Sequence, residues 1–199
     1  MPPQSQSLDN HALDTLFRTA RTRYGWSDAP VTEADLRALY DLVKMAPTSA
    51  NCSPARFLFV QSPEARNRLA SLALDSNAEK IRSAPVTAII GYDTKFYDRL
   101  PELFPHTDAR SWFTGSETLA HDTAFRNSSL QGGYFILAAR ALGFDCGPMS
   151  GFDASAVDAE FWTGTDVRTN FICSIGKGTD QGLHPRLPRL AFEDAARIL

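Results

Sequence analysis

The segment PTSANCSP, residues 47–54, gathers small polar side chains directly after a helix-like stretch. Behind Pro47, the residues Thr48, Ser49 and Asn51 offer backbone N–H groups, hydroxyls and one carboxamide, which exceeds what a plain turn requires. This pattern favours a binding surface for a flat polar molecule. The alternative is a helix C-terminus followed by a turn whose hydroxyl and amide side chains bond to their own backbone.

A second candidate pair is Asn77 and Lys80 in the segment NAEK. Because they are three positions apart, they share one face if the segment is helical. A carboxamide both donates and accepts hydrogen bonds, whereas a lysine only donates. The alternative is an ordinary exposed helix, in which asparagine and lysine are common.

The sequence shows no pattern for a metal site or a side-chain nucleophile. The three cysteines are far apart and form no Cys-x-x-Cys pair, and the four histidines have no ligand spacing. We expect Cys52 to be a small buried thiol. A serine-hydrolase motif around Ser150 fails, because it would need glycine where Pro148 stands.

Composition limits the function classes further. The chain has 199 residues, with 20 basic against 23 acidic side chains, which fits a single domain over residues 1–199 or a protomer whose core continues across an interface. This mild acidity argues against nucleic acid or an anionic membrane as partner. The N-terminal MPPQSQSLDN lacks the features of a signal peptide, and no apolar run is long enough to span a bilayer. We therefore expect a cytoplasmic protein.

The first half of the chain predicts helices and buried strands in alternation. Leu8 to Ala20 has the apolar spacing of a helix, and Thr32 with Asp35 resembles a capping box before the next one. Ser62 and Pro63 suit the start of a helix to about Leu74. The strands are expected at RFLFVQ, residues 56–61, and VTAIIGY, residues 86–92.

In the second half, residues 93–117 are expected to form an irregular, aromatic-rich binding flap. A long helix should follow from Thr123 to Gly143, and its small residues, Gly132 and Gly133 among them, would let another helix approach, which suggests a dimer. The remaining expectations are a loop at 147–153, a short helix at 155–161, a strand at 169–176 and a last helix at 192–199. This order predicts an α+β fold.

Five segments, in order along nearly the whole chain, resemble landmarks of the FMN-dependent nitroreductase family. PTSANCSP is similar to its Pro-Ser-Ser-x-Asn-x-Gln-Pro turn, NAEK to an Asn-x-x-Lys pair before a strand, and PMSGFD to a Pro-Ile-Glu-Gly-Phe-Asp loop. ARTRYGW and RLPR resemble its basic segments near the two chain ends. The resemblance implies a nitroreductase-like fold, with a central, mostly antiparallel sheet flanked by helices. It also implies a domain-intertwined homodimer with FMN at its interface and NAD(P)H as reductant.

The resemblance also implies how the cofactor is held. Arginine forks suit a phosphate dianion, and Asn77 and Lys80 would bind the pyrimidine edge, where a cation stabilises the reduced anionic flavin. The loop segment would place backbone N–H groups of Ser150 and Gly151 near N5, and the turn at 47–51 would come from the partner subunit. The implied cofactor-binding residues are Arg21, Thr22, Pro47, Thr48, Ser49, Asn51, Asn77, Lys80, Pro148, Ser150, Gly151, and Arg186 or Arg189. The alternative for each arginine is a solvated surface position.

Two departures from the family pattern concern the pocket. Ser53, Pro54 and Ala55 stand where the family turn commonly ends in Gln-Pro-Trp, so the pocket lacks a bulky tryptophan on that side. Ser150 replaces an acidic residue found in some relatives, which would leave room for an anionic substrate.

Longer strings resemble the malonic semialdehyde reductase branch of pyrimidine catabolism, namely PTSANCSPARF, FYDRLPELFPHTDARSWF, FRNSS and GPMSGFD. This branch implies reduction of malonic semialdehyde to 3-hydroxypropanoate in a ping-pong cycle, with the hydride chemistry supplied by the cofactor and no dedicated catalytic side chain. A cation should bind the substrate carboxylate, and Arg56, Arg110 and Arg126 are candidates; each could instead form an intrachain ion pair.

Two other functions stay open at this point. The same fold could reduce nitroaromatics or quinones, or it could be a flavin-binding dimer without turnover. The sequence does not separate NADH from NADPH, because it lacks a glycine-rich dinucleotide fingerprint.

Overall fold

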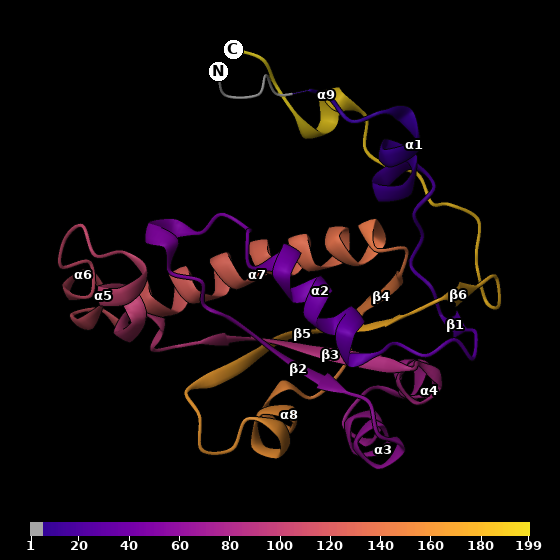
Figure 1. Cartoon of the computed structure of the whole chain (residues 1–199), viewed down its shortest axis with the longest axis horizontal. Coiled ribbons are helices and arrows are strands. Elements are labelled where there is room, and N and C mark those ends of the chain that lie inside the picture. The colour runs from indigo at the N-terminus through magenta and orange to yellow at the C-terminus, as the bar shows by residue number, and fades with distance from the viewer. Residues whose placement is uncertain (1–5) are drawn as a thin grey trace.

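The computed structural model describes residues 6–199. A four-stranded antiparallel sheet in the order β2–β3–β5–β4 forms its centre, and a short ribbon pairs β1 with β6. The strands are β1 (Gly25–Trp26), β2 (Ala55–Val60), β3 (Val86–Asp93), β4 (Asp145–Met149), β5 (Val167–Gly176) and β6 (Gly178–Thr179). Helices cover both faces of the sheet (Figure 1), which confirms the expected α+β fold with its antiparallel sheet.

The helices begin where the sequence supplies caps. Thr32 and Asp35 form the expected capping box at the start of α2, and Ser62 caps α3 with Pro63 in its first turn. The α-helices are α1 (Asn10–Leu13), α2 (Glu33–Val43), α3 (Pro63–Ser71), α4 (Asp75–Ser83), α5 (Leu100–Leu103), α6 (Ser111–Thr114), α7 (Glu117–Ala141), α8 (Ala154–Phe161) and α9 (Phe192–Ala195). Three further helical segments are not α-helical. A π-helical turn forms η1 (Asp14–Arg18), and 3₁₀ turns form η2 (Ser49–Asn51) and η3 (Phe96–Arg99).

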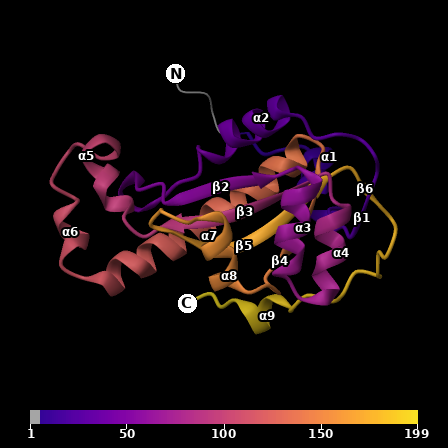
Figure 2. The same ribbon diagram turned by 90° about the horizontal axis from the view of Figure 1, so that it is seen from below.

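The core follows from the alternation of side chains along the central strand β3. Val86, Ala88 and Ile90 pack in one buried cluster with residues of α2 and α7, whereas Ile89 packs in a second cluster with residues of α3, α4 and α8. Figures 1 and 2 show these two helix layers on opposite sides of the sheet. The sheet is therefore covered on both faces.

The structure corrects the expected loop at 147–153. Gly147, Pro148 and Met149 belong to β4, and only the residues from Ser150 onward form the loop. Glycine and proline weaken strand prediction, but β4 lies at the edge of the sheet, where a proline is tolerated.

The expectation that residues 93–117 are irregular is wrong, whereas their role as a binding flap stays a prediction. This excursion contains η3, α5 and α6, and it has its own core, in which Phe96, Leu100 and Phe113 are buried. Its aromatic side chains therefore stabilise the excursion itself, although Trp112 remains half exposed.

Helix boundaries differ from several predictions. The long helix α7 begins at Glu117 instead of Thr123, because Ser116 accepts a hydrogen bond from the N–H of Leu119 at 3.3 Å. The first helix is split into α1 and a wider turn, η1, while α3 ends at Ser71 and α9 at Ala195, earlier than expected.

The small face of α7 packs within the chain. A Cβ added at Gly132 would lie 2.5 Å from the ring of Phe171 in β5, so this glycine lets the helix approach its own sheet. The prediction that Gly132 serves another helix is therefore wrong, whereas Gly133 faces open space.

Two expectations concern the chain's surroundings. Among the residues that the structure describes, none of the helices combines the length and apolar character needed to cross a membrane. The absence of a signal peptide was predicted from residues 1–10, of which residues 1–5 lie outside the described part of the chain.

Candidate cofactor site

A cavity of about 700 Å³ brings together the four residues expected to bind a phosphate. Its lining includes Arg21, Thr22, Arg186 and Arg189, together with Arg140 from the last turn of α7. None of the described residues that line it carries a carboxylate. Several guanidinium groups without a counter-charge fit an anion such as a phosphate dianion.

The C-terminal segment holds these arginines against the N-terminal segment. Arg21 donates to the carbonyl oxygen of His184, and Arg186 Nη2 donates to the carbonyl oxygens of Arg18 and Ala20, each at 2.8 Å. Arg189, in contrast, donates to carbonyls of its own neighbours in the chain. The side chain of Arg186 is therefore held by the N-terminal segment, whereas that of Arg189 contacts carbonyls of its own segment.

Asn77, Lys80 and Gly151 form a second cluster. The Nδ2 of Asn77 donates to the carbonyl of Gly151 at 3.1 Å, and Lys80 Nζ donates to Asn77 Oδ1 at 3.0 Å. A Cβ at Gly151 would lie 2.7 Å from Asn77 Nδ2, so this approach requires glycine. The expected shared helix face of Asn77 and Lys80 is thus confirmed in α4.

Tyr24 joins the two clusters. The ammonium of Lys80 lies 4.7 Å from the centre of the Tyr24 ring, and Tyr24 also lines the arginine cavity. Thr22 bridges to Cys146 in β4, the strand that leads to Pro148 and the exposed Ser150. Nine of the predicted cofactor residues therefore lie in the arginine cavity, in the Asn77–Lys80–Gly151 cluster or in the segment from Pro148 that follows, near α4, β1 and β6.

The turn at 47–51 lies elsewhere. Asn51 Nδ2 donates to the carbonyl of Leu103 in α5 at 2.9 Å, and Figures 1 and 2 place α5 and α6 at the opposite end of the molecule from α4, β1 and β6. A single chain therefore does not bring Pro47, Thr48, Ser49 and Asn51 to the arginine cavity.

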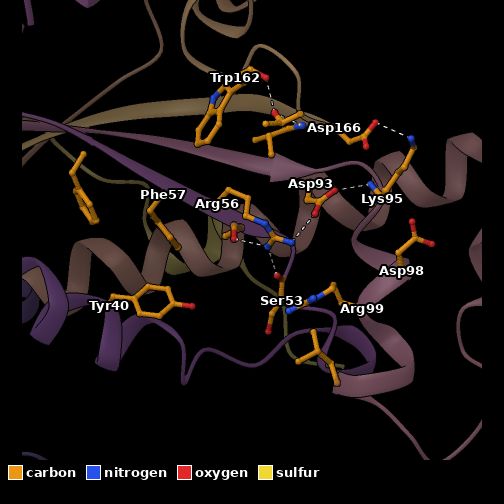
Figure 3. Close-up of a pocket in the computed structure, with 15 residues that line it drawn as sticks. Tyr40, Ser53, Arg56, Phe57, Asp93, Lys95, Asp98, Arg99, Trp162 and Asp166 are labelled. Carbon is orange, nitrogen blue, oxygen red and sulfur yellow. Dashed lines mark hydrogen bonds and ion pairs between the residues drawn. The ribbon is translucent and has the colours of Figure 1, made fainter. Parts of the chain in front are cut away.

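Arg56 lies in a different cavity, of about 870 Å³, beside the edge strand β2. Its Nη2 is 2.6 Å from Asp93 Oδ2, and its Nη1 donates to the carbonyls of Ser53 and Ala55 at 3.0 and 2.9 Å. Figure 3 shows the Arg56 guanidinium between Asp93 and Ser53. The alternative of an intrachain ion pair is thus what this structure shows for Arg56.

The two other candidate substrate arginines are exposed. Arg110 Nε pairs with Asp98 Oδ1 at 2.8 Å, and its guanidinium lies 5.9 Å from the Tyr97 ring centre. Arg126 lies on the exposed side of α7, beside a shallow hollow that Phe125 and Leu130 also line. Their role in substrate binding stays a prediction.

The pKa values of two buried thiols and one buried phenol are raised. Burial raises the pKa of the Cys52 thiol to about 11, and burial raises the pKa of Tyr92. The Cys146 thiol, together with burial, raises the pKa of Cys173. In residues 6–199, no group of three or more potential metal ligands is present.

Sequence reasoning missed Arg140 and Tyr24. Arg140 lies more than a hundred positions from Arg21, and nothing local marks it as part of an anion site. Tyr24 stands in the quoted ARTRYGW segment, so its position was available as a signal, but its contact with Lys80 depends on tertiary structure.

Comparisons with known proteins point to one family. A model of the Nitroreductase family matches residues 18–177. A protein of Caulobacter sp. (strain K31), which carries the name NADH dehydrogenase/NAD(P)H nitroreductase as a provisional assignment, is 62% identical over 193 residues, spanning 96% of this chain and 98% of that protein. A Ralstonia pickettii protein with the same provisional name and the addition HadB is 56% identical over 190 residues, spanning 94% and 97%.

Solved structures share the fold. A crystal structure from Exiguobacterium sibiricum 255-15, of a protein described as a nitroreductase in complex with FMN, has a TM-score of 0.84. The match covers 98% of this chain and 99% of that one, at 21% sequence identity. At this identity the likeness concerns the fold.

Proposed function

The chain belongs to the nitroreductase family, and from this premise we propose that it is an FMN-dependent oxidoreductase, which oxidises NAD(P)H and reduces malonic semialdehyde to 3-hydroxypropanoate. The proposal rests on the cavity that several arginines and no carboxylate line, next to the cluster of Asn77, Lys80 and Gly151. A phosphate site beside a polar cluster is what a flavin mononucleotide requires of a protein.

FMN, when bound, supplies the hydride chemistry, so the residues of this chain serve to bind and orient. Arg21, Thr22 and Arg186 would hold the phosphate, with Arg140 and Arg189 contributing charge. Lys80 and Asn77 would contact the pyrimidine edge, where the ammonium favours added negative charge. The backbone at Ser150 and Gly151 would border the reactive ring.

The working unit is a homodimer. The turn at 47–51 lies at the opposite end of the chain from the arginine cavity, so one complete site needs two copies. Exposed apolar side chains on neighbouring helices support such an interface; they are Tyr40, Leu42 and Met45 on or just after α2, and Leu119, Phe125, Leu130 and Tyr134 on α7.

The substrate proposal rests on the longer strings that resemble the malonic semialdehyde reductase branch. The substrate carries a carboxylate, and Arg110 or Arg126 would offer it an exposed guanidinium. Ser150, which stands where some relatives have an acidic residue, adds no negative charge near the reactive ring.

The test begins with the colour of the purified protein and its release of FMN on denaturation. Turnover of malonic semialdehyde, a nitroaromatic and a quinone is then measured with NADH and with NADPH. We expect a yellow protein that NAD(P)H bleaches and that turns over the acid aldehyde with the highest kcat/KM. A colourless protein that also fails to bind added FMN would refute the cofactor, and bound flavin that NAD(P)H leaves oxidised would refute an enzymatic function.

A second candidate function is reduction of nitroaromatics or quinones. The names of the Caulobacter and Ralstonia relatives favour it, since both include NAD(P)H nitroreductase. A higher kcat/KM for the nitro or quinone substrate than for malonic semialdehyde would make it the function.

A further inference from the structure

The turn that carries Thr48, Ser49 and Asn51 adopts a strained backbone. Ala50, Asn51 and Ser53 have φ angles of 49°, 51° and 39°, in the left-handed region that favours glycine. Alanine and serine rarely adopt this conformation, and it persists only where neighbouring contacts determine it. The contacts that hold this turn therefore identify what fixes its shape.

Two buried amides of α7 bind the backbone on either side of the strained residues, at Ser49 and at Ala55 of β2. Asn127 Oδ1 accepts the N–H of Ser49, and Gln131 Oε1 accepts the N–H of Ala55, both at 2.9 Å. Asn127 and Gln131 are 2% and 4% exposed, and they are one helical turn apart on the same face of α7. Because a backbone N–H can only donate, both side-chain oxygens are fixed as the acceptors.

The helix fixes the first of these amides in turn. Asn127 Nδ2 donates to the carbonyl of Thr123 at 2.8 Å, so its oxygen can point only toward the turn. Inside the turn, Thr48 Oγ1 accepts the N–H of Ser53 at 3.1 Å, which closes the strained segment on itself. The side chains on α7 thus set where the turn lies, and Thr48 sets its internal shape.

We infer that Asn127 and Gln131 are positioning residues, which hold the 48–53 turn in the conformation that contacts FMN in the partner subunit's site. The inference rests on the proposed function for the identity of the ligand. Neither residue touches the flavin; each acts through the N–H group that it binds. Loss of the Gln131 acceptor leaves the buried N–H of Ala55 without its partner, and loss of the Asn127 acceptor frees the partly buried N–H of Ser49. Either loss releases the strained turn.

A matched pair of substitutions at Gln131 tests the inference. Gln131→Met keeps the length of the side chain but removes the acceptor, whereas Gln131→Glu keeps an oxygen at that position. We expect Gln131→Met to weaken FMN binding by at least about tenfold and to change the visible circular dichroism of the bound flavin. Gln131→Glu should keep most of the FMN affinity and most of the circular dichroism signal of the unsubstituted protein. Asn127→Leu is expected to act like Gln131→Met.

A control on the same helix separates positioning from general stability. Ser128 is fully buried, and its Oγ accepts a hydrogen bond from Asn170 of β5 at 2.7 Å, away from the turn. We expect Ser128→Ala to lower the melting temperature without changing FMN affinity or the flavin spectrum. If Gln131→Met also lowers only the melting temperature, the inference is overturned.

Hydrogen exchange gives a readout that does not depend on flavin. The amides of Ser49 and Ala55 should exchange slowly in the unsubstituted protein, and Asn127→Leu should accelerate exchange at Ser49 far more than Ser128→Ala does. Unchanged exchange at Ser49 would show that Asn127 does not hold the turn, and this would overturn the inference. A protein that binds no FMN but shows this acceleration would refute the proposed function and the role of the turn toward FMN. The hold of Asn127 on the turn would then still be established.

Discussion

Guanidinium groups that line one cavity without a carboxylate repel one another unless an anion lies between them. Arg21 and Arg186 both line the cavity and are held in place by backbone carbonyls. At the scale of single residues this arrangement is the strongest chemical signal in the molecule, since the carbonyl contacts hold the cations together even before an anion binds.

The phosphate assignment predicts a selective loss of affinity. We expect Arg186→Gln to weaken FMN binding by about tenfold to a hundredfold, because it removes charge-assisted hydrogen bonds. Riboflavin, which lacks the phosphate, should bind the Arg186→Gln variant and the unsubstituted protein with equal affinity. Arg189→Gln is the matched control and should have the smaller effect, because Arg189 bonds only to its own neighbours. Equal losses for FMN and riboflavin in Arg186→Gln would contradict the assignment, as titrations followed by flavin fluorescence will show.

Arg110 is expected to bind the substrate carboxylate. Its ion pair with Asp98 uses Nε, and exposed pairs contribute little to stability, about 0–1 kcal/mol. The arginine can therefore exchange Asp98 for a substrate. Arg110→Ala should raise KM for malonic semialdehyde more than for a neutral quinone. Arg56→Ala is the comparison, and it should lower stability instead, because Arg56 binds Asp93 and the Ser53 carbonyl. The same change in KM for both substrates in Arg110→Ala would contradict this role.

Cys52 should be chemically inert. It is 1% exposed, and burial raises its pKa to about 11, so at pH 8 roughly one thiol in a thousand would be ionised. We expect thiol reagents to leave Cys52 unmodified in the folded protein at pH 8 and to modify it after denaturation. Cys52→Ala should retain turnover. Rapid labelling of Cys52 in the folded state, located by mass spectrometry, would show that the residue is accessible and reactive.

At the scale of secondary structure, the sequence predicted the features that neighbouring residues determine, such as helix starts. The capping box at Thr32 and Asp35 and the Ser62–Pro63 start each depend on residues within one helical turn, and both were confirmed. The strand at Gly147 and Pro148 was missed because its partner, β5, lies about 25 residues away, and an edge position is a property of the sheet.

Two adjacent glycines of α7 offer a test of helix packing. Gly132→Ala should destabilise the protein by about 1–3 kcal/mol, because the new methyl group meets the Phe171 ring. Gly133→Ala should leave the free energy of unfolding unchanged or raise it by up to about 1 kcal/mol, because its methyl group meets no atom within 4 Å. Chemical denaturation of both variants measures the difference. Similar effects at both positions would mean that α7 does not pack on β5 as described.

At the scale of the whole molecule, the predicted cofactor residues divide into two groups. One chain brings Arg21, Asn77, Lys80 and Gly151 to the same end of the molecule, and the order of the motifs in the sequence was enough to nominate them as candidates. The turn at 47–51 was also found by its motif, but its distance from the cavity follows from the sheet order and from the excursion containing α5. The sequence motifs predict the members of each group, and the separation of the two groups in one chain is the reason why the proposed site would need two copies.

This division predicts that dimerisation and FMN affinity fall together. Phe125 and Leu130 are half exposed on α7, and Phe125→Asp with Leu130→Asp would place carboxylates at the proposed interface, where unpaired charge is costly. We expect this double variant to sediment as a monomer and to bind FMN far more weakly, since each site would lose the partner's turn. Ala159→Asp, on exposed α8 at the other face of the sheet, is the control and should remain a dimer. A monomeric variant that keeps full FMN affinity would mean that one chain completes the site, because the cavity arginines would then hold the flavin without a second copy.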